Sequence, residues 1–198
     1  MKLNAVEKVL MNNPVRSAVQ RWYEVPLLRD IGGSTCGERV LEIGCGRGVG
    51  TEQILRRFDA ASVVAIDLDP DMVRRARARL ARFESRCELR VGDASVLDFG
   101  DDSFDAVFDF GIIHHIPDWP AAVTEVSRVL RPGGRFFFEE VTNHALDRWS
   151  YRTFLEHPRE NRFSPTQFLQ ALDSNGLRSI GAVERFFGDF VIGVATRE

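Results

Sequence analysis

Residues 39–48 read RVLEIGCGRG, a short apolar run followed by glycines on alternate positions. The run has the length and composition of a buried strand. Glycine has no Cβ, so the backbone after the strand can turn sharply and approach a ligand closely. The segment therefore predicts a strand that opens at its carboxyl end into a ligand-binding loop, with Glu42 beside that loop.

Strands and helices alternate from this segment onward. Apolar or alternating runs predict further strands over residues 62–66, 87–91, 106–110, 135–139, 177–186 and 189–195. Strands joined by helical crossovers pair in parallel, whereas the short turn around Gly188 can only join antiparallel strands. We therefore predict an α/β fold, a doubly wound, Rossmann-like, mostly parallel seven-stranded sheet. It has one antiparallel strand near the C-terminus and helices on both faces.

The two ends of the chain differ from this alternating core. Apolar residues stand at helical spacing after Pro14, namely Val15, Ala18, Val19 and Trp22. This spacing predicts an amphipathic helix, which Pro26 would kink or end before a loop over residues 31–37. We predict a single domain over residues 1–198. It would comprise an N-terminal helical cover (1–30), a cofactor-binding core (39–140), an insertion or lid (141–163), and a final helix with two strands (164–198).

Composition and charge narrow the classes of function. Hydrophobic residues make up 44% and charged residues 28%, as is typical of a soluble globular protein. The net charge of −3 and the pI near 5.9 argue against a nucleic-acid partner. The arginines between positions 74 and 90 are expected to form a solvated helix face.

The cysteines and the hydropathy pattern indicate the compartment. Cys36, Cys45 and Cys87 have neither disulfide-framework nor zinc-site spacing, so no metal site is expected. No stretch approaches the ~18 apolar residues needed to span a bilayer. We predict a cytoplasmic protein without a membrane span.

Acidic residues follow the ends of the first three predicted strands, where open α/β sheets bind ligands. Glu42 can accept hydrogen bonds from an ammonium group or from the N–H groups of its own loop. Asp67 can accept from both hydroxyls of a ribose, and Asp93 can accept from an exocyclic amine. Leu68 would offer an apolar surface to a base. Together these residues describe a ligand with an adenine, a ribose and an amino acid.

The glycine spacing argues against a pyrophosphate site. The dinucleotide fingerprint G-x-G-x-x-G requires a third glycine five residues after the first. Counted from Gly44 or from Gly46, that position holds Val49 or Thr51. A phosphate-binding loop is therefore disfavoured.

The series of motifs resembles the class I S-adenosylmethionine-dependent methyltransferases, particularly the small-molecule type. The resemblance runs from about Val40 to Glu140 and rests on VLEIGCGRG, VVAIDLDPDMVRRA, VGDASVLDF, DDSFDAVFDFGIIHHIPD and RVLRPGGRFFFEE. It implies S-adenosylmethionine as the cofactor, S-adenosylhomocysteine as its product, and a small-molecule methyl acceptor.

The resemblance also implies roles for individual residues. Gly44 and Gly46 would pack on the methionine portion of the cofactor, with Cys45 contributing backbone rather than a nucleophile. Asp67 would hold the ribose, and Asp93 with the Ala94 backbone would bind the adenine. Asp109 and Phe110 would line the methionine and sulfonium end.

A sulfonium already carries an activated methyl group, so the protein must mainly align the acceptor for in-line displacement and exclude water. A general base is needed only if the acceptor must lose a proton. The candidates are His114, Glu139 and Glu140, and strand alternation should point only one of the two glutamates inward. The predicted acceptor is apolar or aromatic, in a pocket with Trp22, Tyr23, His115, Trp149 and Tyr151.

Two other classes stay open at this point. One is a non-catalytic cofactor-binding or partner-scaffold protein of the same fold, and the other is a nicotinamide-dependent Rossmann enzyme. The identity of the acceptor and the oligomeric state cannot be inferred from these patterns.

Overall fold

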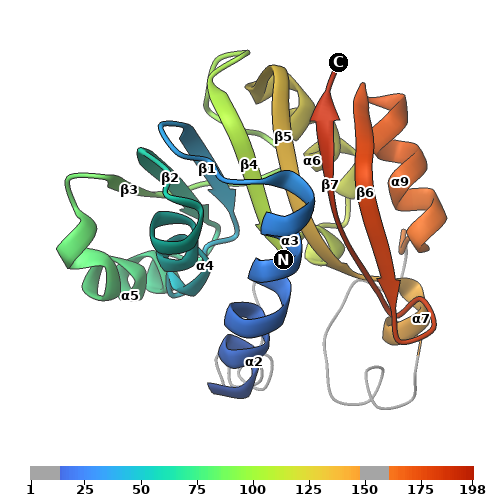
Figure 1. Ribbon diagram of the computed structural model, residues 1–198, viewed down its shortest axis with the longest axis horizontal. Helices are drawn as coiled ribbons and strands as arrows, with labels where there is room; N and C mark the ends of the chain where they lie inside the picture. Colours follow the sequence, from blue (N-terminus) through green and yellow to red (C-terminus); the bar gives the residue numbers. More distant parts are fainter. Residues whose placement is uncertain (1–13, 148–160) are drawn as a thin grey trace.

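A computed structural model describes residues 14–147 and 161–198 of the protein. One seven-stranded sheet crosses the molecule, with helices against both faces (Figure 1). The strand order is β3-β2-β1-β4-β5-β7-β6. Strand β7 runs antiparallel to both of its neighbours, and the pairs from β3 to β5 are parallel. The predicted fold class is therefore confirmed, including its single antiparallel strand.

The elements follow the order expected from the sequence. The strands are β1 (Arg39–Ile43), β2 (Ser62–Asp67), β3 (Cys87–Val91), β4 (Phe104–Phe110), β5 (Leu130–Val141), β6 (Leu177–Arg185) and β7 (Phe190–Arg197). The α-helices are α2 (Pro14–Val19), α3 (Val25–Gly32), α4 (Val49–Gln53), α5 (Pro70–Leu80), α6 (Trp119–Val129), α7 (Asn143–Leu146) and α9 (Pro165–Ser174). The π-helical turns are η1 (Gln20–Glu24) and η2 (Ile54–Phe58), and the 3-10 turns are η3 (Ala81–Phe83) and η4 (Ile113–His115). Most of the predicted insertion, including Trp149 and Tyr151, lies outside the described residues.

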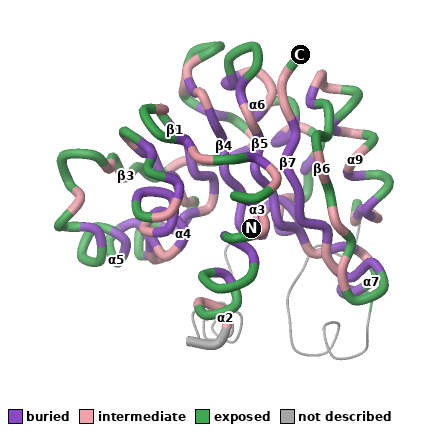
Figure 2. Tube along the Cα trace, viewed as in Figure 1, coloured by how far each residue is buried: buried purple, intermediate pink, exposed green. Residues whose placement is uncertain are grey.

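Phenylalanine side chains fill the core on both faces of the sheet. On one face, Phe108 of β4 and Phe137 of β5 stack with 4.3 Å between ring centroids, and Phe58 packs edge-on against both. On the other face, Phe138 packs edge-on against Phe168 of α9. All five side chains are fully buried. Strands β4 and β5 are thus covered on both sides, as the buried centre of Figure 2 shows.

The N-terminal helical segment continues from Pro14 to Gly32, so the prediction that a loop begins at Ile31 is wrong. Pro26 does not end the helix, because it lies at the start of α3 directly after the π-helical turn η1. A proline lacks the N–H of the helical ladder, and its ring crowds the carbonyl four residues earlier. A wider π-helical turn at this place relieves that conflict.

This segment buries the face opposite to the predicted one. Of its apolar stripe, Ala18, Val19 and Trp22 are exposed. The polar residues Gln20 and Glu24 are buried instead. The sequence therefore predicted the helix correctly and its orientation incorrectly.

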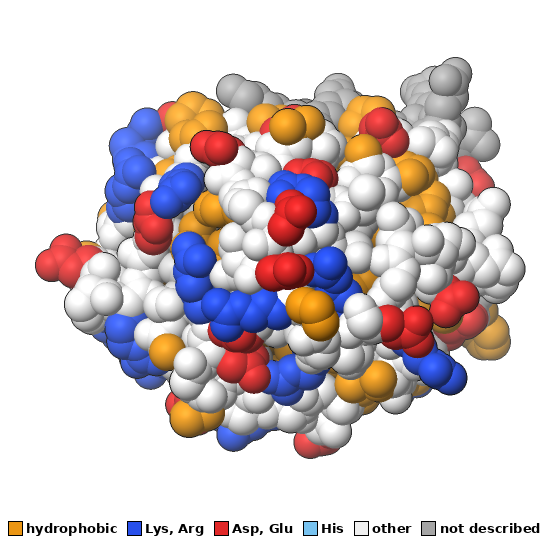
Figure 3. All heavy atoms as spheres, turned by 90° about the horizontal axis from the view of Figure 1, so that it is seen from above, with side chains coloured by type: hydrophobic (Ala, Val, Ile, Leu, Met, Phe, Trp, Pro, Cys, Tyr) orange, Lys and Arg blue, Asp and Glu red, His pale blue; other side chains and the backbone are white. Residues whose placement is uncertain are grey.

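The arginines between positions 74 and 90 are all exposed, as expected for a solvated face. Several pair with acids, for example Arg74 with Asp71 and Arg82 with Glu52. Seen from above, basic and acidic side chains are interspersed over the surface (Figure 3). Within the described residues, no helix has both the length and the apolar character required to cross a bilayer.

We predict that Phe137→Ala lowers the free energy of unfolding by about 3–5 kcal/mol, because the fully buried ring leaves a cavity between Phe58 and Phe108. Urea unfolding followed by circular dichroism measures the loss. Val96→Ala is the control, since its side chain is 74% exposed and should change stability by less than ~0.5 kcal/mol. An equal loss in both variants would contradict this description of the core.

Candidate functional site

A cavity of about 380 Å³ opens at the carboxyl edge of the parallel strands. Its walls come from the ends of β1, β2 and β4, the loops that follow these strands and β3, and the α2–η1 segment. Nine of the ten residues predicted to bind the cofactor line this cavity, namely Glu42, Gly44, Cys45, Gly46, Asp67, Leu68, Asp93, Ala94 and Phe110. The tenth, Asp109, does not.

The three glycines after β1 stand at their positions for different structural reasons. Gly44 has φ +70°, and a Cβ there would lie 2.3 Å from the Ile112 side chain. Gly46 also has a positive φ, +54°, but open space surrounds the position of its absent Cβ. A Cβ on Gly48 would meet Leu80 of α5 at 2.8 Å, so that glycine serves packing between helices. The cavity wall at Gly46 is therefore bare backbone.

Cys45 contributes backbone to this loop. Its N–H donates to the carbonyl of Ile66 at 2.8 Å, and its side chain is buried. Burial raises the pKa of the Cys45 thiol far above its ordinary value. The thiol therefore stays protonated and is unsuited to act as a nucleophile.

Asp67 joins the ends of two loops at the cavity. Its Oδ2 accepts the N–H of Gly46 at 2.8 Å, and its Oδ1 accepts the N–H of Asp69 at 2.9 Å. Asp69 in turn caps α5 by accepting the N–H of Asp71. Asp67 is thus a structural link as well as a candidate ligand residue.

Asp93 begins the loop after β3. Its Oδ1 accepts the N–H of Ser95 at 2.9 Å and the Ser95 hydroxyl at 2.7 Å. The hydroxyl bond is the largest cause that lowers the pKa of Asp93, so this carboxylate is charged at neutral pH. Leu68 and Ala94 give this end of the cavity an apolar wall.

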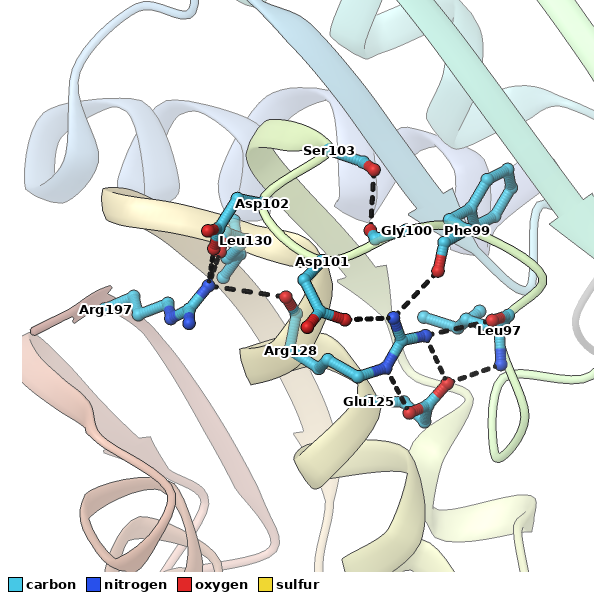
Figure 4. A network of polar contacts seen from close by, with 10 residues as sticks. All are labelled: Leu97, Phe99, Gly100, Asp101, Asp102, Ser103, Glu125, Arg128, Leu130 and Arg197. Carbon is cyan, nitrogen blue, oxygen red and sulfur yellow. Dashed lines mark hydrogen bonds and ion pairs between the residues drawn. The ribbon is translucent and has the colours of Figure 1, made fainter.

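The loop that carries Asp93 is fixed from behind by a polar network (Figure 4). Arg128 of α6 donates to the carbonyls of Phe99 at 2.7 Å and Leu97 at 3.0 Å. Glu125 accepts the N–H of Leu97 at 2.7 Å and binds the same guanidinium. None of the residues in this network lines the cavity, so the network holds the loop without entering the site.

Glu42 is completely buried in the cavity wall. The hydroxyl of Thr51 donates to it, and a Cβ on Gly50 would lie 2.1 Å from its Oε1, so only glycine leaves room for the carboxyl. Burial raises the pKa of Glu42 to about 8, and the charges of Asp67 and Asp109 add to the rise. A cation bound in the cavity would favour the charged form of this carboxyl.

Asp109 lies behind the cavity, which corrects its predicted place in the lining. Alternation along β4 directs Phe110 into the cavity and Asp109 to the opposite face. Its Oδ1 accepts the N–H of Ile112 at 2.9 Å. Burial and the neighbouring Glu140 raise the pKa of Asp109 well above its ordinary value. Asp109 is therefore favoured in its protonated form.

Glu140 and His114 also lie behind the cavity wall. The Glu140 carboxylate accepts the N–H of Ile113 at 2.6 Å and the N–H of His114 at 3.2 Å, and it lies 2.6 Å from Nδ1 of His114. Burial raises the pKa of Glu140 to about 7. Neither residue lines the cavity, so the geometry does not support them as bases that meet an acceptor. They instead fix the turn η4, whose last residue, His115, does line the cavity.

Glu139 and Glu140 point to opposite faces of β5, as strand alternation predicts, and neither lines the cavity. Both are buried because this strand is covered on both faces. Glu139 binds Nη2 of Arg16 at 2.6 Å, and Nη1 of Arg16 binds Glu24 at 2.7 Å. Burial and the nearby Glu139 raise the pKa of Glu24 to about 8. This bridge attaches the N-terminal segment to the sheet, and Arg16 lines the cavity.

Two aromatic residues predicted for the acceptor pocket lie outside the cavity. Trp22 is exposed between the guanidinium groups of Arg21 and Arg57, at 5.0 and 5.7 Å from its ring. The hydroxyl of Tyr23 accepts a hydrogen bond from Arg185. They point outward because the opposite face of the segment is the buried one.

Several lining residues were not expected from the sequence. Arg16, Ser17 and Gln20 line the cavity from the N-terminal segment. The four-residue spacing of Arg16, Gln20 and Glu24 is the signal that identifies a polar helix face, and the apolar stripe beside it outweighed that signal.

The amino-acid sequence of the chain is similar to those of known methyltransferases. Residues 40–134 match the family model described as a methyltransferase domain. The chain is 40% identical over 104 residues to a fatty-acid O-methyltransferase of Mycolicibacterium smegmatis, covering 52% of this chain and 37% of that protein. It is 28% identical over 183 residues to a phthiotriol/phenolphthiotriol dimycocerosates methyltransferase of Mycobacterium tuberculosis, covering 91% and 66%.

The fold has close counterparts among solved structures. An S-adenosylmethionine-dependent methyltransferase of Aquifex aeolicus matches with a TM-score of 0.75 at 20% identity, over 98% of each chain. At that identity the likeness concerns the fold alone. The chain spans less than two thirds of the length of both curated relatives.

We predict that Gly44→Ala destabilises the protein more than Gly46→Ala, by roughly 1–3 kcal/mol. Both substitutions place a methyl group on a residue with positive φ, so the backbone strain is matched. Only the Gly44 variant adds a clash with Ile112. Thermal and urea unfolding compare the pair, and equal losses would contradict the described loop.

A second prediction concerns the pH dependence of stability through Glu42. Because the pKa of this carboxyl rises from 4.5 to about 8 on folding, the stabilisation by its proton is complete below the unfolded value and is lost as the pH rises through about 8. Glu42→Gln removes that loss. Its stability relative to the natural protein should rise between about pH 5 and pH 8.5, by on the order of 1–3 kcal/mol. The exposed Glu84→Gln is the control, and a difference that is flat with pH would refute the assignment.

Proposed function

Because the chain belongs to the class I S-adenosylmethionine-dependent methyltransferases, we propose that it transfers a methyl group from S-adenosylmethionine to a small apolar acceptor. The observation that carries the proposal is the single cavity in which three acidic strand ends, Glu42, Asp67 and Asp93, meet the bare backbone of Gly46.

The residues of the cavity fit the chemistry of this cofactor. Asp67 would accept from the ribose hydroxyls, and Asp93 with the Ala94 backbone would bind the adenine amine. Glu42 would face the amino-acid end, where an ammonium group would favour its ionised form. When bound, the cofactor supplies an activated methyl group. A pyrophosphate-binding loop is disfavoured, because Gly48 packs closely against Leu80.

The opposite end of the cavity would receive the acceptor. Its lining includes Gln20 of η1 and the residues His115 and Ile116 after β4. The relative from M. smegmatis is named for a fatty acid, an apolar molecule with one polar end, which supports an apolar acceptor here. His115 would orient that polar end and take its proton where the acceptor carries one.

Glu139, Glu140 and His114 would act indirectly. Glu140 holds the backbone of η4 and therefore the position of His115. Glu139 holds Arg16 and therefore the helix that closes the cavity. Residues that fix a reacting group in place contribute to catalysis by orientation.

The free thiols Cys36, Cys45 and Cys87 support a reducing, cytoplasmic setting.

Calorimetry with S-adenosylmethionine, S-adenosylhomocysteine and NAD tests the proposed cofactor. Both methionine-derived ligands should bind and NAD should not. Asp67→Asn should weaken binding roughly 10–100-fold, because a charge-assisted bond to the ribose is lost. The exposed Asp71→Asn is a matched control with affinity unchanged. NAD binding of comparable strength, or unchanged affinity in Asp67→Asn, would overturn the assignment.

Transfer itself is read by mass spectrometry with a labelled methyl donor and a series of fatty acids and hydroxylated apolar compounds. A product heavier by one labelled methyl group in place of hydrogen supports the enzyme. Cofactor binding without transfer to any compound of the series would favour a non-catalytic protein of the same fold.

A further inference from the structure

The exposed aromatic side chains of the described residues lie in two segments. Trp22 and Tyr23 belong to η1, and Phe186 and Phe187 form the turn between β6 and β7. Phe187 is 96% exposed and Phe186 is 67% exposed. Single exposed apolar side chains are common, but neighbouring exposed phenylalanines mark a contact surface.

The turn holds the two phenylalanines in an unfavourable backbone conformation. Phe186 has φ +51° and Phe187 has φ +61°, values that bulky residues rarely adopt. The turn is braced from β5 and α7, because the hydroxyl of Thr142 donates to the carbonyl of Gly188 and its N–H donates to that of Asp189. A fixed turn that combines backbone strain with exposed rings is typical of a functional surface.

The N-terminal segment contributes a second apolar surface. Its polar side holds Arg16 and Gln20 at the cavity, whereas Val19 and Trp22 face solvent. A helix with its apolar stripe exposed and arginines beside it has the pattern of an interfacial helix. Arg21 and Arg57 lie against the Trp22 ring.

The two segments meet at the edge of the sheet that carries the cavity. Arg185, the last residue of β6, donates a hydrogen bond to the hydroxyl of Tyr23. Both β6 and β5 run antiparallel to β7, so the carboxyl end of β6 lies at the cavity edge of the sheet, on the same side as α2 (Figure 1). We call the exposed residues Val19, Trp22, Tyr23, Phe186 and Phe187 the aromatic rim.

We propose that the aromatic rim docks on a lipid surface with anionic headgroups, which places the cavity mouth where an apolar acceptor is dissolved. This inference rests on the proposed function. Phenylalanine inserts into the apolar layer, tryptophan and tyrosine favour the headgroup level, and Arg21, Arg57 and Arg185 offer cations to anionic headgroups. The two phenylalanines would bury about 150–250 Å² each in the apolar layer.

Cosedimentation with vesicles of phosphatidylcholine and phosphatidylglycerol tests the proposal on the full chain. The natural protein should bind, and Phe187→Asn should lower the partition coefficient about ten-fold or more. Asparagine adopts a positive φ readily, so the thermal midpoint of this variant should be unchanged or higher. Ile180→Asn is the matched control, because Ile180 is 52% exposed on the same strand away from the turn. The control should bind vesicles as the natural protein does.

Three outcomes would overturn the proposal. The natural protein does not cosediment, or Phe187→Asn binds as strongly as the control, or sedimentation velocity shows a dimer that Phe187→Asn abolishes. The last result would assign the rim to a second copy of the chain. Calorimetry with S-adenosylhomocysteine and transfer to a water-soluble short-chain acceptor are measured in parallel. These two readouts test the proposed function independently of vesicle binding.

Discussion

Carboxylates lie close together at one edge of the sheet. The surrounding loops fold so that these carboxylates accept hydrogen bonds. Parallel pairing brings the ends of β1, β2, β4 and β5 together, and each end carries an acid. Asp67, Asp109 and Glu140 accept N–H groups from the chain that follows a strand, as when Asp67 binds Gly46 and Asp69. A buried carboxylate without such partners would be too costly to retain. The loops that enclose the cavity are therefore folded around their own acids.

Burial, with a smaller contribution from repulsion among these groups, changes their protonation. It raises the pKa of Glu42 to about 8 and that of Glu140 to about 7, and it raises the pKa of Asp109 beside Glu140. A bound cation would replace a proton at Glu42. The acids behind the wall, Asp109 and Glu140, differ because they do not line the cavity and instead accept N–H groups of the chain after β4. Acidic residues thus line the cavity in one layer, and in the layer behind it they hold the turn after β4 in place.

The sequence predicted most of the fold because its signals are local. The apolar run of β1, the Asp69 cap of α5 and the turn at Gly188 each act within a few residues. Nine of the ten residues predicted to bind the cofactor line one cavity, because strand ends converge by topology. Asp109 was predicted to line the cavity, but it is the neighbour of Phe110 in β4 and therefore points to the opposite face of the strand. The orientation of the N-terminal segment was predicted incorrectly because it depends on the contact between Arg16 and Glu139. These residues are 123 positions apart, and such a contact leaves no periodic signal in the sequence.

The place of β7 has a consequence for how the chain folds. This strand, Phe190–Arg197, follows β6 in the chain but lies between β5 and β6, so the two parts of the sheet stay separate until β7 inserts between them. Until then β5 presents an open edge beside Phe136, Phe137 and Phe138, which is a template for pairing with another chain. Insertion of β7, rather than assembly of strands β1 to β4, is the step that removes the hazard of aggregation.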